Sequence, residues 1–237
     1  MFTKVALTIV VILVLAGLGC SSPASSIVFT SDRDGNLEIY SVNSNGEKLT
    51  NLTNTQTHEF APVLSPNHRL ISFLSGVQGN TSVEVMRIDG TERIPLTERG
   101  SEHSSQQWSP FNDRIAYVKK DGSDSYIYMT SVGETKTALL TSIEGHQVGD
   151  WSGDGNSVAF WVVGGSGQGI YVRNPDGVNE FQVTEGPDYS PLWSPDSRKL
   201  AFLSTRDGNP EIYMMDADGG NLKRLTENES KEYHLPW

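Results

Sequence analysis

Short apolar segments recur along the chain, separated by stretches rich in Gly, Asp, Asn and Pro. The most regular marker is a Trp followed by Ser, which occurs at Trp108, Trp151 and Trp193. Leu64-Ser65 takes this place one repeat earlier, and Trp237 takes it one repeat later. Successive markers lie 42 to 44 residues apart. A fixed period of this length is typical of repeat architectures.

Three further markers keep the same period. The first is Ile27-Val28-Phe29, Ile71-Ser72-Phe73, Ile115-Ala116-Tyr117, Val158-Ala159-Phe160 and Leu200-Ala201-Phe202. The second is Ile39-Tyr40, Val85-Met86, Ile127-Tyr128, Ile170-Tyr171 and Ile212-Tyr213. The third is Leu52-Thr53, Leu96-Thr97, Leu140-Thr141, Val183-Thr184 and Leu225-Thr226. Four markers in register across five copies predict one structural unit repeated five times.

Each copy alternates short strand-like segments with turn pairs such as Asp34-Gly35, Asn45-Gly46 and Asp121-Gly122. Such pairs favour hairpins. No stretch after Cys20 keeps a helical apolar period over three turns. Four strands in about 42 residues indicate the blade of a β-propeller. The sequence therefore predicts an all-β fold, a β-propeller of five four-stranded blades.

The order of the marker strands also predicts how the ring closes. Its first marker strand begins at Ile27, and the last marker, Trp237, belongs to the strand that precedes this one in every other copy. The N- and C-terminal strands are therefore expected to pair, which would remove an exposed sheet edge. We expect a monomeric propeller, with an incomplete ring closed by dimerisation as the alternative.

The repeats also resemble a known family. The segments Trp193-Ser194-Pro195-Asp196, Leu200-Ala201-Phe202 and Arg206–Tyr213 are similar to the WD40-like (PD40) repeat of TolB-type β-propellers, and Ser31–Tyr40 matches the same pattern. The resemblance covers Ile27 to Trp237. The second and fourth copies depart from it in the Asp-Gly turn. The resemblance implies the fold. It does not transfer the role of TolB in the cell envelope, because the pattern lacks the sixth blade and the N-terminal domain of TolB.

The N-terminal segment is typical of a signal peptide. Val5–Leu18 is almost unbroken apolar sequence, shorter than the roughly 20 residues of a membrane-spanning helix. Small residues follow, and then Cys20, so the segment resembles a prokaryotic lipoprotein signal. We expect residues 1–19 to be the signal peptide, residues 20–26 the lipidated Cys20 with a short tether, and residues 27–237 the propeller. An ordinary secretory signal or an uncleaved anchor is the alternative.

Composition narrows the function classes. The chain of 237 residues has a net charge of -11 and a pI near 4.8, so a phosphate backbone would be repelled and nucleic-acid binding is not expected. Cys20 is the only cysteine, which excludes an internal disulfide and a metal site with several Cys ligands.

One set of ionisable residues keeps a fixed place in the repeat. Five residues before each Trp marker stand Glu59, His103, His146, Asp188 and Glu232. The interpretation we favour is a polar repeat residue that bonds the backbone of the neighbouring blade or caps its turn. If the positions instead face a central channel, imidazoles and carboxylates could hold a divalent cation or titrate near neutral pH.

Known catalytic motifs are absent from the sequence. It has no Gly-x-Ser-x-Gly elbow, no His-Glu-x-x-His and no Walker A lysine motif. We therefore expect a membrane-anchored lipoprotein on the extracytoplasmic side, whose propeller binds or scaffolds another envelope or extracellular protein without a cofactor. Two alternatives stay open: a carbohydrate-active or metal-dependent enzyme that uses the ionisable positions, and a sensor domain for a small ligand.

Overall fold

A computed structural model describes residues 26–134, 137–141, 146–176 and 179–233. These residues form five antiparallel sheets. They contain no helix long and apolar enough to cross a lipid bilayer. The chain divides into two compact units, Met1–Gly100 and Ser101–Trp237, which are described separately. The all-β prediction is confirmed.

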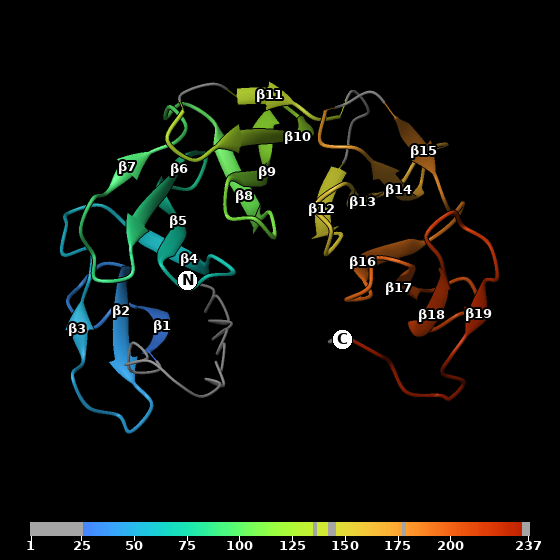
Figure 1. Cartoon of the computed structure of the whole chain (residues 1–237), viewed down its shortest axis with the longest axis horizontal. Coiled ribbons are helices and arrows are strands. Elements are labelled where there is room, and N and C mark those ends of the chain that lie inside the picture. The colour runs from blue at the N-terminus through green and yellow to red at the C-terminus, as the bar shows by residue number, and fades with distance from the viewer. Residues whose placement is uncertain (1–25, 135–136, 142–145, 177–178, 234–237) are drawn as a thin grey trace, which may run out of the picture. The chain divides into compact units, whose positions relative to one another are not determined.

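Unit 1 holds two sheets, with the strand orders β1-β2-β3 and β4-β5-β6-β7 (Figure 1). Its strands are β1 (Ser26–Ser31), β2 (Glu38–Asn43), β3 (Thr50–Asn51), β4 (Glu59–Leu64), β5 (Leu70–Val77), β6 (Asn80–Arg87) and β7 (Ile94–Pro95). β1 and β2 pack against β4, so the two sheets share a core. The first sheet has three strands among the described residues, where the second has four.

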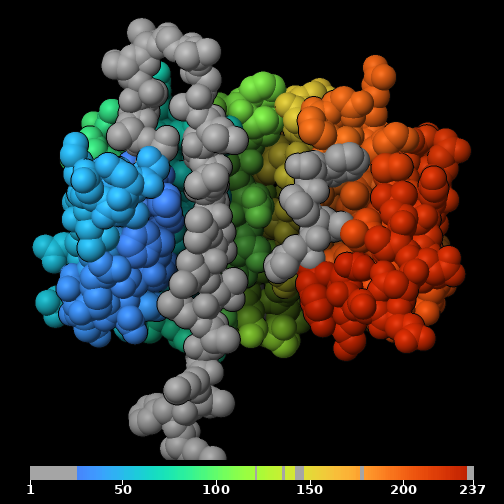
Figure 2. Space-filling view, turned by 90° about the horizontal axis from the view of Figure 1, so that it is seen from below, coloured from blue at the N-terminus to red at the C-terminus, as the bar shows by residue number. Residues whose placement is uncertain are grey.

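Unit 2 holds three four-stranded sheets, each a simple meander. Its strands are β8 (Glu102–Trp108), β9 (Arg114–Asp121), β10 (Asp124–Ser131), β11 (Thr137–Leu139), β12 (His146–Trp151), β13 (Val158–Val162), β14 (Gly169–Arg173), β15 (Glu180–Gln182), β16 (Asp188–Trp193), β17 (Lys199–Ser204), β18 (Glu211–Asp216) and β19 (Lys223–Arg224). β12 packs against both β8 and β16. Figure 2 shows the three sheets as successive green, yellow to orange, and red blocks of surface.

The aromatic residues of the repeat markers fill the cores. Facing aromatic residues on paired strands stack within four of the sheets, with ring centroids 5.4 to 6.1 Å apart: Phe29 on Tyr40, Tyr117 on Tyr128, Phe160 on Tyr171 and Phe202 on Tyr213. Trp108, Trp151 and Trp193 are buried. Stacked aromatic pairs contribute free energy beyond the burial of their apolar area. The marker positions are therefore the positions of these packing contacts.

The Leu-Thr marker has a specific hydrogen-bonding role. In every copy the Thr hydroxyl oxygen accepts a bond, at 2.8 to 3.1 Å, from a backbone N–H that lies 14 residues earlier, on the strand next to the edge strand. The pairs are Thr53 with Ile39, Thr97 with Val83, Thr141 with Ile127, Thr184 with Ile170 and Thr226 with Ile212. A strand N–H at the edge of the ladder is thereby satisfied.

The same contacts correct one prediction of the sequence. Thr97 binds the N–H of Val83, and Phe73 pairs with Glu84, where the other sheets pair an aromatic residue with Tyr. The second copy of the Ile-Tyr marker is therefore Val83-Glu84, and its assignment to Val85-Met86 was wrong. Glu84 replaces the Tyr, and the short Gln78-Gly79 turn replaces an Asp-Gly loop, so both features that would have fixed the alignment are missing.

Two predictions fall outside the described residues. The signal peptide, Cys20 and most of the tether lie in residues 1–25, and Trp237 lies in residues 234–237. The lipid anchor, the pairing of the terminal strands, and with it the number of blades in the ring, stay predictions.

Candidate functional site

The five ionisable repeat positions are placed in two different ways. Glu59, Asp188 and His103 are buried at or near the start of β4, β16 and β8. His146 begins β12, and its side chain lies outside the described residues. Glu232 is half-buried beyond β19. Glu59 belongs to unit 1 and the other four to unit 2.

Glu59 has no solvent exposure and both of its carboxylate oxygens are bonded. Thr55 Oγ1 donates to Oε2 at 2.7 Å, and Ser75 Oγ and Arg93 Nη2 each donate to Oε1 at 3.1 Å. Arg93 Nε also donates to Glu84 at 2.5 Å, so one guanidinium serves two buried carboxylates. Burial raises the pKa of Glu59 above its ordinary value, against the opposing effect of these donors.

Asp188 is equally buried but less completely bonded. Arg206 Nη2 donates to its Oδ2 at 2.5 Å. The guanidinium of Arg206 lies over Phe202 and Tyr213, 5.9 and 5.0 Å from the ring centroids. The other oxygen of Asp188, Oδ1, is buried and has no hydrogen-bond partner among the described residues.

The other members of the set have separate surroundings. The ring of His103 lies 5.5 Å from that of Tyr117. Glu232 accepts a bond from Asn228 Nδ2 at 3.0 Å. Within the described part of the chain, no three His, Cys, Asp or Glu side chains lie close enough together to hold a metal ion. The divalent cation stays a prediction, since the side chain of His146 is not described.

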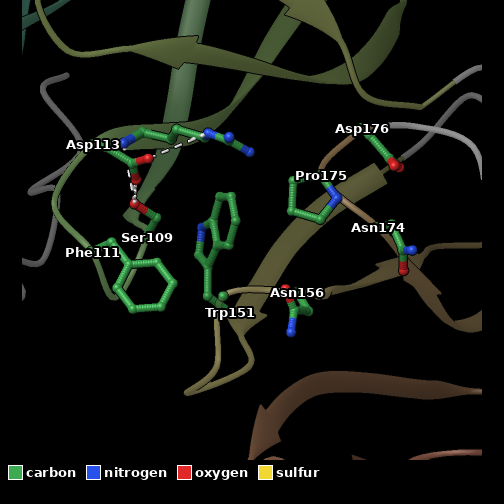
Figure 3. A pocket seen from close by; sticks show the side chains of 10 residues that line it. Ser109, Phe111, Asp113, Trp151, Asn156, Asn174, Pro175 and Asp176 are labelled. Atoms are coloured by element: carbon green, nitrogen blue, oxygen red, sulfur yellow. Dashed lines mark hydrogen bonds and ion pairs between the residues drawn. The ribbon is translucent and has the colours of Figure 1, made fainter.

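A cavity in unit 2 lies elsewhere, at one end of its first two sheets. Its volume is about 360 Å³. Ser109, Phe111, Asp113 and Arg114 come from the β8–β9 turn, Trp151, Gly155 and Asn156 from the end of β12 and the turn after it, and Asn174, Pro175 and Asp176 from the segment after β14. Figure 3 shows Phe111 and Trp151 on one side of this space and Pro175 and Asp176 across from them. We call it the Phe111 cavity.

Local sequence explains why the Phe111 cavity is held open. Ser109 Oγ donates to Asp113 at 2.6 Å and accepts from the N–H of Arg114, which closes the β8–β9 turn. The ring of Phe111 rests over Gly155, where an added Cβ would come within 2.5 Å of it. Phe111 is 65% exposed although it is a large aromatic residue. An exposed aromatic ring among carboxylates, amides and a guanidinium makes a surface suited to binding.

The Ser residues of the Trp-Ser markers are used inside the turns. Ser152 and Ser194 donate to Asp154 and Asp196 at 2.6 Å, as Ser109 donates to Asp113. These contacts are intrinsic to each repeat, so they give Ser109 a structural role in its turn.

Sequence reasoning did not single out the residues of the Phe111 cavity, and its ionisable repeat positions lie elsewhere. Phe111 follows Trp108-Ser109-Pro110 and stands at the turn position that is Asn67, Asp154 and Asp196 in other copies. An aromatic residue inside a polar turn was the one signal available. Asn174–Asp176 carry no comparable signal, since their closeness to Phe111 depends on how neighbouring sheets pack.

Comparisons with known proteins agree with this architecture. The sequence pattern of the TolB beta propeller domain (PD40) matches residues 83–237. A "Protein TolB homolog" of Chlorobium luteolum is 28% identical over 137 residues, 57% of this chain and 31% of that protein. The homolog of Chlorobaculum tepidum is 27% identical over 115 residues, 48% of this chain and 26% of that protein. The chain thus matches about a third or less of the length of these relatives.

Solved structures show the same fold. TolB from Acinetobacter baumannii superposes with a TM-score of 0.65 at 16% identity, over 87% of this chain and 54% of that one. An oligogalacturonate lyase in complex with manganese also gives 0.65 at 16% identity, over 86% and 62% of the two chains. A puromycin-hydrolyzing peptidase of Mycobacterium tuberculosis gives 0.67 at 14% identity, over 91% and 37%. The fold therefore accompanies enzymes as well as TolB. Because the family pattern matches well over half of its length, the chain belongs to the TolB beta propeller domain family.

Proposed function

We propose that this chain is an extracytoplasmic protein, held at the cell envelope by a lipid on Cys20, whose propeller binds another envelope or extracellular protein. Membership in the TolB propeller family supports the binding role, and the lipoprotein-like segment that ends at Cys20 supports the location. The chain then acts as a rigid scaffold with one partner surface.

The observation that carries the proposal is the Phe111 cavity. Protein interfaces are centred on partly exposed aromatic anchors within a polar rim, and Phe111 with its rim of Asp113, Asn156 and Asp176 has that composition. Burying an exposed Phe ring against a partner contributes about 2 kcal/mol. Partner side chains that enter about 360 Å³ between two sheets would meet both the ring and hydrogen-bonding groups.

The test is quantitative co-purification from the membranes of the source cells after cross-linking. The wild type is compared with Phe111→Ser and with the matched control Leu139→Ser, which removes an exposed apolar side chain on β11. We expect one protein in near-equal amount with the wild type and the control, and at least about tenfold less with Phe111→Ser, equivalent to about 1.4 kcal/mol. Equal recovery with all three variants would refute the role of this cavity.

The anchor is tested separately. Cys20→Ser should move the protein from the membrane fraction to the soluble extracytoplasmic fraction, because stable membrane attachment at this site would depend on the acyl chains. Retention of the variant in the membrane would contradict lipid anchoring and would leave the partner experiment unaffected.

A further inference from the structure

The sheet of β1, β2 and β3 differs from the other four at one edge. In each four-stranded sheet the second strand pairs with the strand that precedes it in the chain: β5 with β4, β9 with β8, β13 with β12 and β17 with β16. β1 holds the place of these second strands, because it carries the marker Ile27-Val28-Phe29. Among the described residues β1 pairs only with β2. An edge of this kind is a template for a further strand.

The side chains of β1 show the same difference. Phe202 and Ser204 on β17 are buried. Phe29 and Ser31 hold the equivalent places on β1 and are only partly buried. A missing first strand accounts for this exposure, because in the other sheets that strand lies beside the marker.

Arg33 follows β1 as Arg206 follows β17. Its Nε donates to Ser31 Oγ at 3.0 Å, and its guanidinium lies 5.4 and 4.5 Å from the ring centroids of Phe29 and Tyr40. Arg206 makes the same contacts with the equivalent serine and rings, and it also pairs with a buried carboxylate. Arg33 is exposed and has no carboxylate within ion-pair distance in the part of the chain that the structure describes. The arginine is therefore positioned for a carboxylate.

The backbone at Glu232 is placed like the start of a first strand. The N–H of Glu232 donates to the carbonyl oxygen of Pro210 at 3.1 Å, as the N–H of Glu59 donates to that of Leu37 at 2.7 Å. Glu59 is the first residue of β4. Asn228 Nδ2 donates to one oxygen of the Glu232 carboxylate at 3.0 Å.

The remaining chain has the length of one such strand. Residues 232–237 number six, as do the residues of β1, β4, β12 and β16. They end on Trp237, as β12 and β16 end on Trp151 and Trp193. Residues 234–237 lie outside the described part of the chain.

We propose that residues 232–237 add the missing first strand to β1 of the same chain and that Arg33 binds the carboxylate of Glu232. Glu232 would stand toward Arg33 as Asp188 stands toward Arg206, in a charge-assisted hydrogen bond. The added strand would also bury the partly exposed marker side chains of β1. A tethered segment has a higher effective concentration at β1 than the same segment of a second copy, which favours pairing within one chain.

The register of the other sheets fixes which residues should meet. Asp188 on β16 lies opposite Ser204 on β17. The same register places Glu232 opposite Ser31. Residues directly opposite each other in an antiparallel pair have Cα atoms about 4.5 to 5.5 Å apart, a separation that a disulfide can span.

The first test is therefore disulfide formation between Ser31→Cys and Glu232→Cys in the full chain, with Cys20→Ser so that no other thiol is present. Thr30→Cys with Glu232→Cys is the matched control, because neighbouring residues of a strand face opposite sides of the sheet. Under mild oxidation we expect an intrachain disulfide from the Ser31 pair, formed at least about tenfold faster than from the Thr30 pair. A disulfide between two chains, equal rates for both pairs, or no disulfide would each overturn the proposal.

The ion pair is tested by urea unfolding of Arg33→Met, Glu232→Gln and the double variant. The loss in the unfolding equilibrium constant of the double variant should be about fivefold smaller than the product of the single losses, equivalent to about 1 kcal/mol. Glu229→Gln, at an exposed carboxylate of the same segment, is the control, and its loss should simply multiply with that of Arg33→Met. The same independence for Glu232→Gln would overturn the assignment of Arg33, and if a variant does not fold the disulfide rates decide where the segment lies.

Discussion

Glu59 and Asp188 occupy the same place in two repeats, yet their surroundings differ. Both are fully buried carboxylates paired with an arginine. The arginine of Glu59 is Arg93, from the segment before β7, and that of Asp188 is Arg206, from the loop after β17. Both carboxylate oxygens of Glu59 accept hydrogen bonds, whereas Asp188 Oδ1 has no partner among the residues that the structure describes. The second and fifth copies thus share a buried acid–arginine pair, but different positions supply the arginine.

The reason lies in the neighbouring turns. In the fifth copy a Thr-Arg-Asp-Gly loop places Arg206 over Phe202 and Tyr213. In the second copy the Gln78-Gly79 turn has no arginine, Glu84 replaces the Tyr, and Arg93 lies 5.2 Å from the ring centroid of Phe73. A buried carboxylate needs a cation or hydrogen-bond donors beside it. Different segments supply the arginine in these two copies.

We expect the largest difference between the two ion pairs to appear with Arg93→Met. It leaves Glu59 and Glu84 buried without their shared cation, so we expect the free energy of unfolding of the region that contains unit 1 to fall by about 5 kcal/mol. Urea unfolding at several pH values measures it. Arg93 opposes the rise that burial causes in the pKa of Glu59, so without it that pKa would rise further. The deficit should therefore be full near pH 7 and shrink as the pH falls toward about 4. A deficit independent of pH would contradict the account.

Arg206→Met should have a smaller effect. It strands only one carboxylate, and Arg206 is partly solvated, so a loss of about 3 kcal/mol in the free energy of unfolding is expected. The same urea titration measures it, with Arg198→Met as a control on an exposed turn of the same sheet. A loss as large as that of Arg93→Met would show that the loss of unfolding free energy does not depend on how many carboxylates the arginine pairs with.

The Thr markers offer a matched pair. Thr226 accepts from the N–H of Ile212 and donates to the buried carboxylate of Glu211 at 2.5 Å. Thr184 accepts from Ile170 in the same way, but Gly169 stands where Glu211 stands. Thr226→Val should cost about 2 kcal/mol of unfolding free energy and Thr184→Val about 1 kcal/mol. Equal losses would mean that the bond to Glu211 contributes nothing.

Acid stability distinguishes two buried glutamates by sign. The Thr226 hydroxyl, with the N–H of Asn228, lowers the pKa of Glu211 to about 2. Its contribution to stability is therefore present above the ordinary value of 4.5 and lost as the pH falls toward 2. Glu211→Gln should flatten the loss of stability in that range. Glu59, whose pKa is raised, should act in the opposite direction, and Glu59→Gln is the matched measurement.

The period of the markers was enough to predict the repeated strands, and the residues of the repeat carried the resemblance to the family. It failed at the second copy, because Glu84 replaces the aromatic residue by which the register was judged. The repeat position of Glu59 and Asp188 was found from spacing alone, but their arginines were not, since Arg93 and Arg206 lie at different offsets. The Phe111 cavity depends on packing between sheets, which a repeat pattern does not encode.

The most direct test of the account is site-specific photo-cross-linking in native membranes, with a photoreactive residue at position 111 and, as the control, at position 139. Both side chains are exposed and apolar in the wild type, but only Phe111 lines a cavity of binding character. The account predicts one cross-linked protein from position 111 and none from position 139. No product from position 111, or the same products from both positions, would contradict a partner surface at the Phe111 cavity.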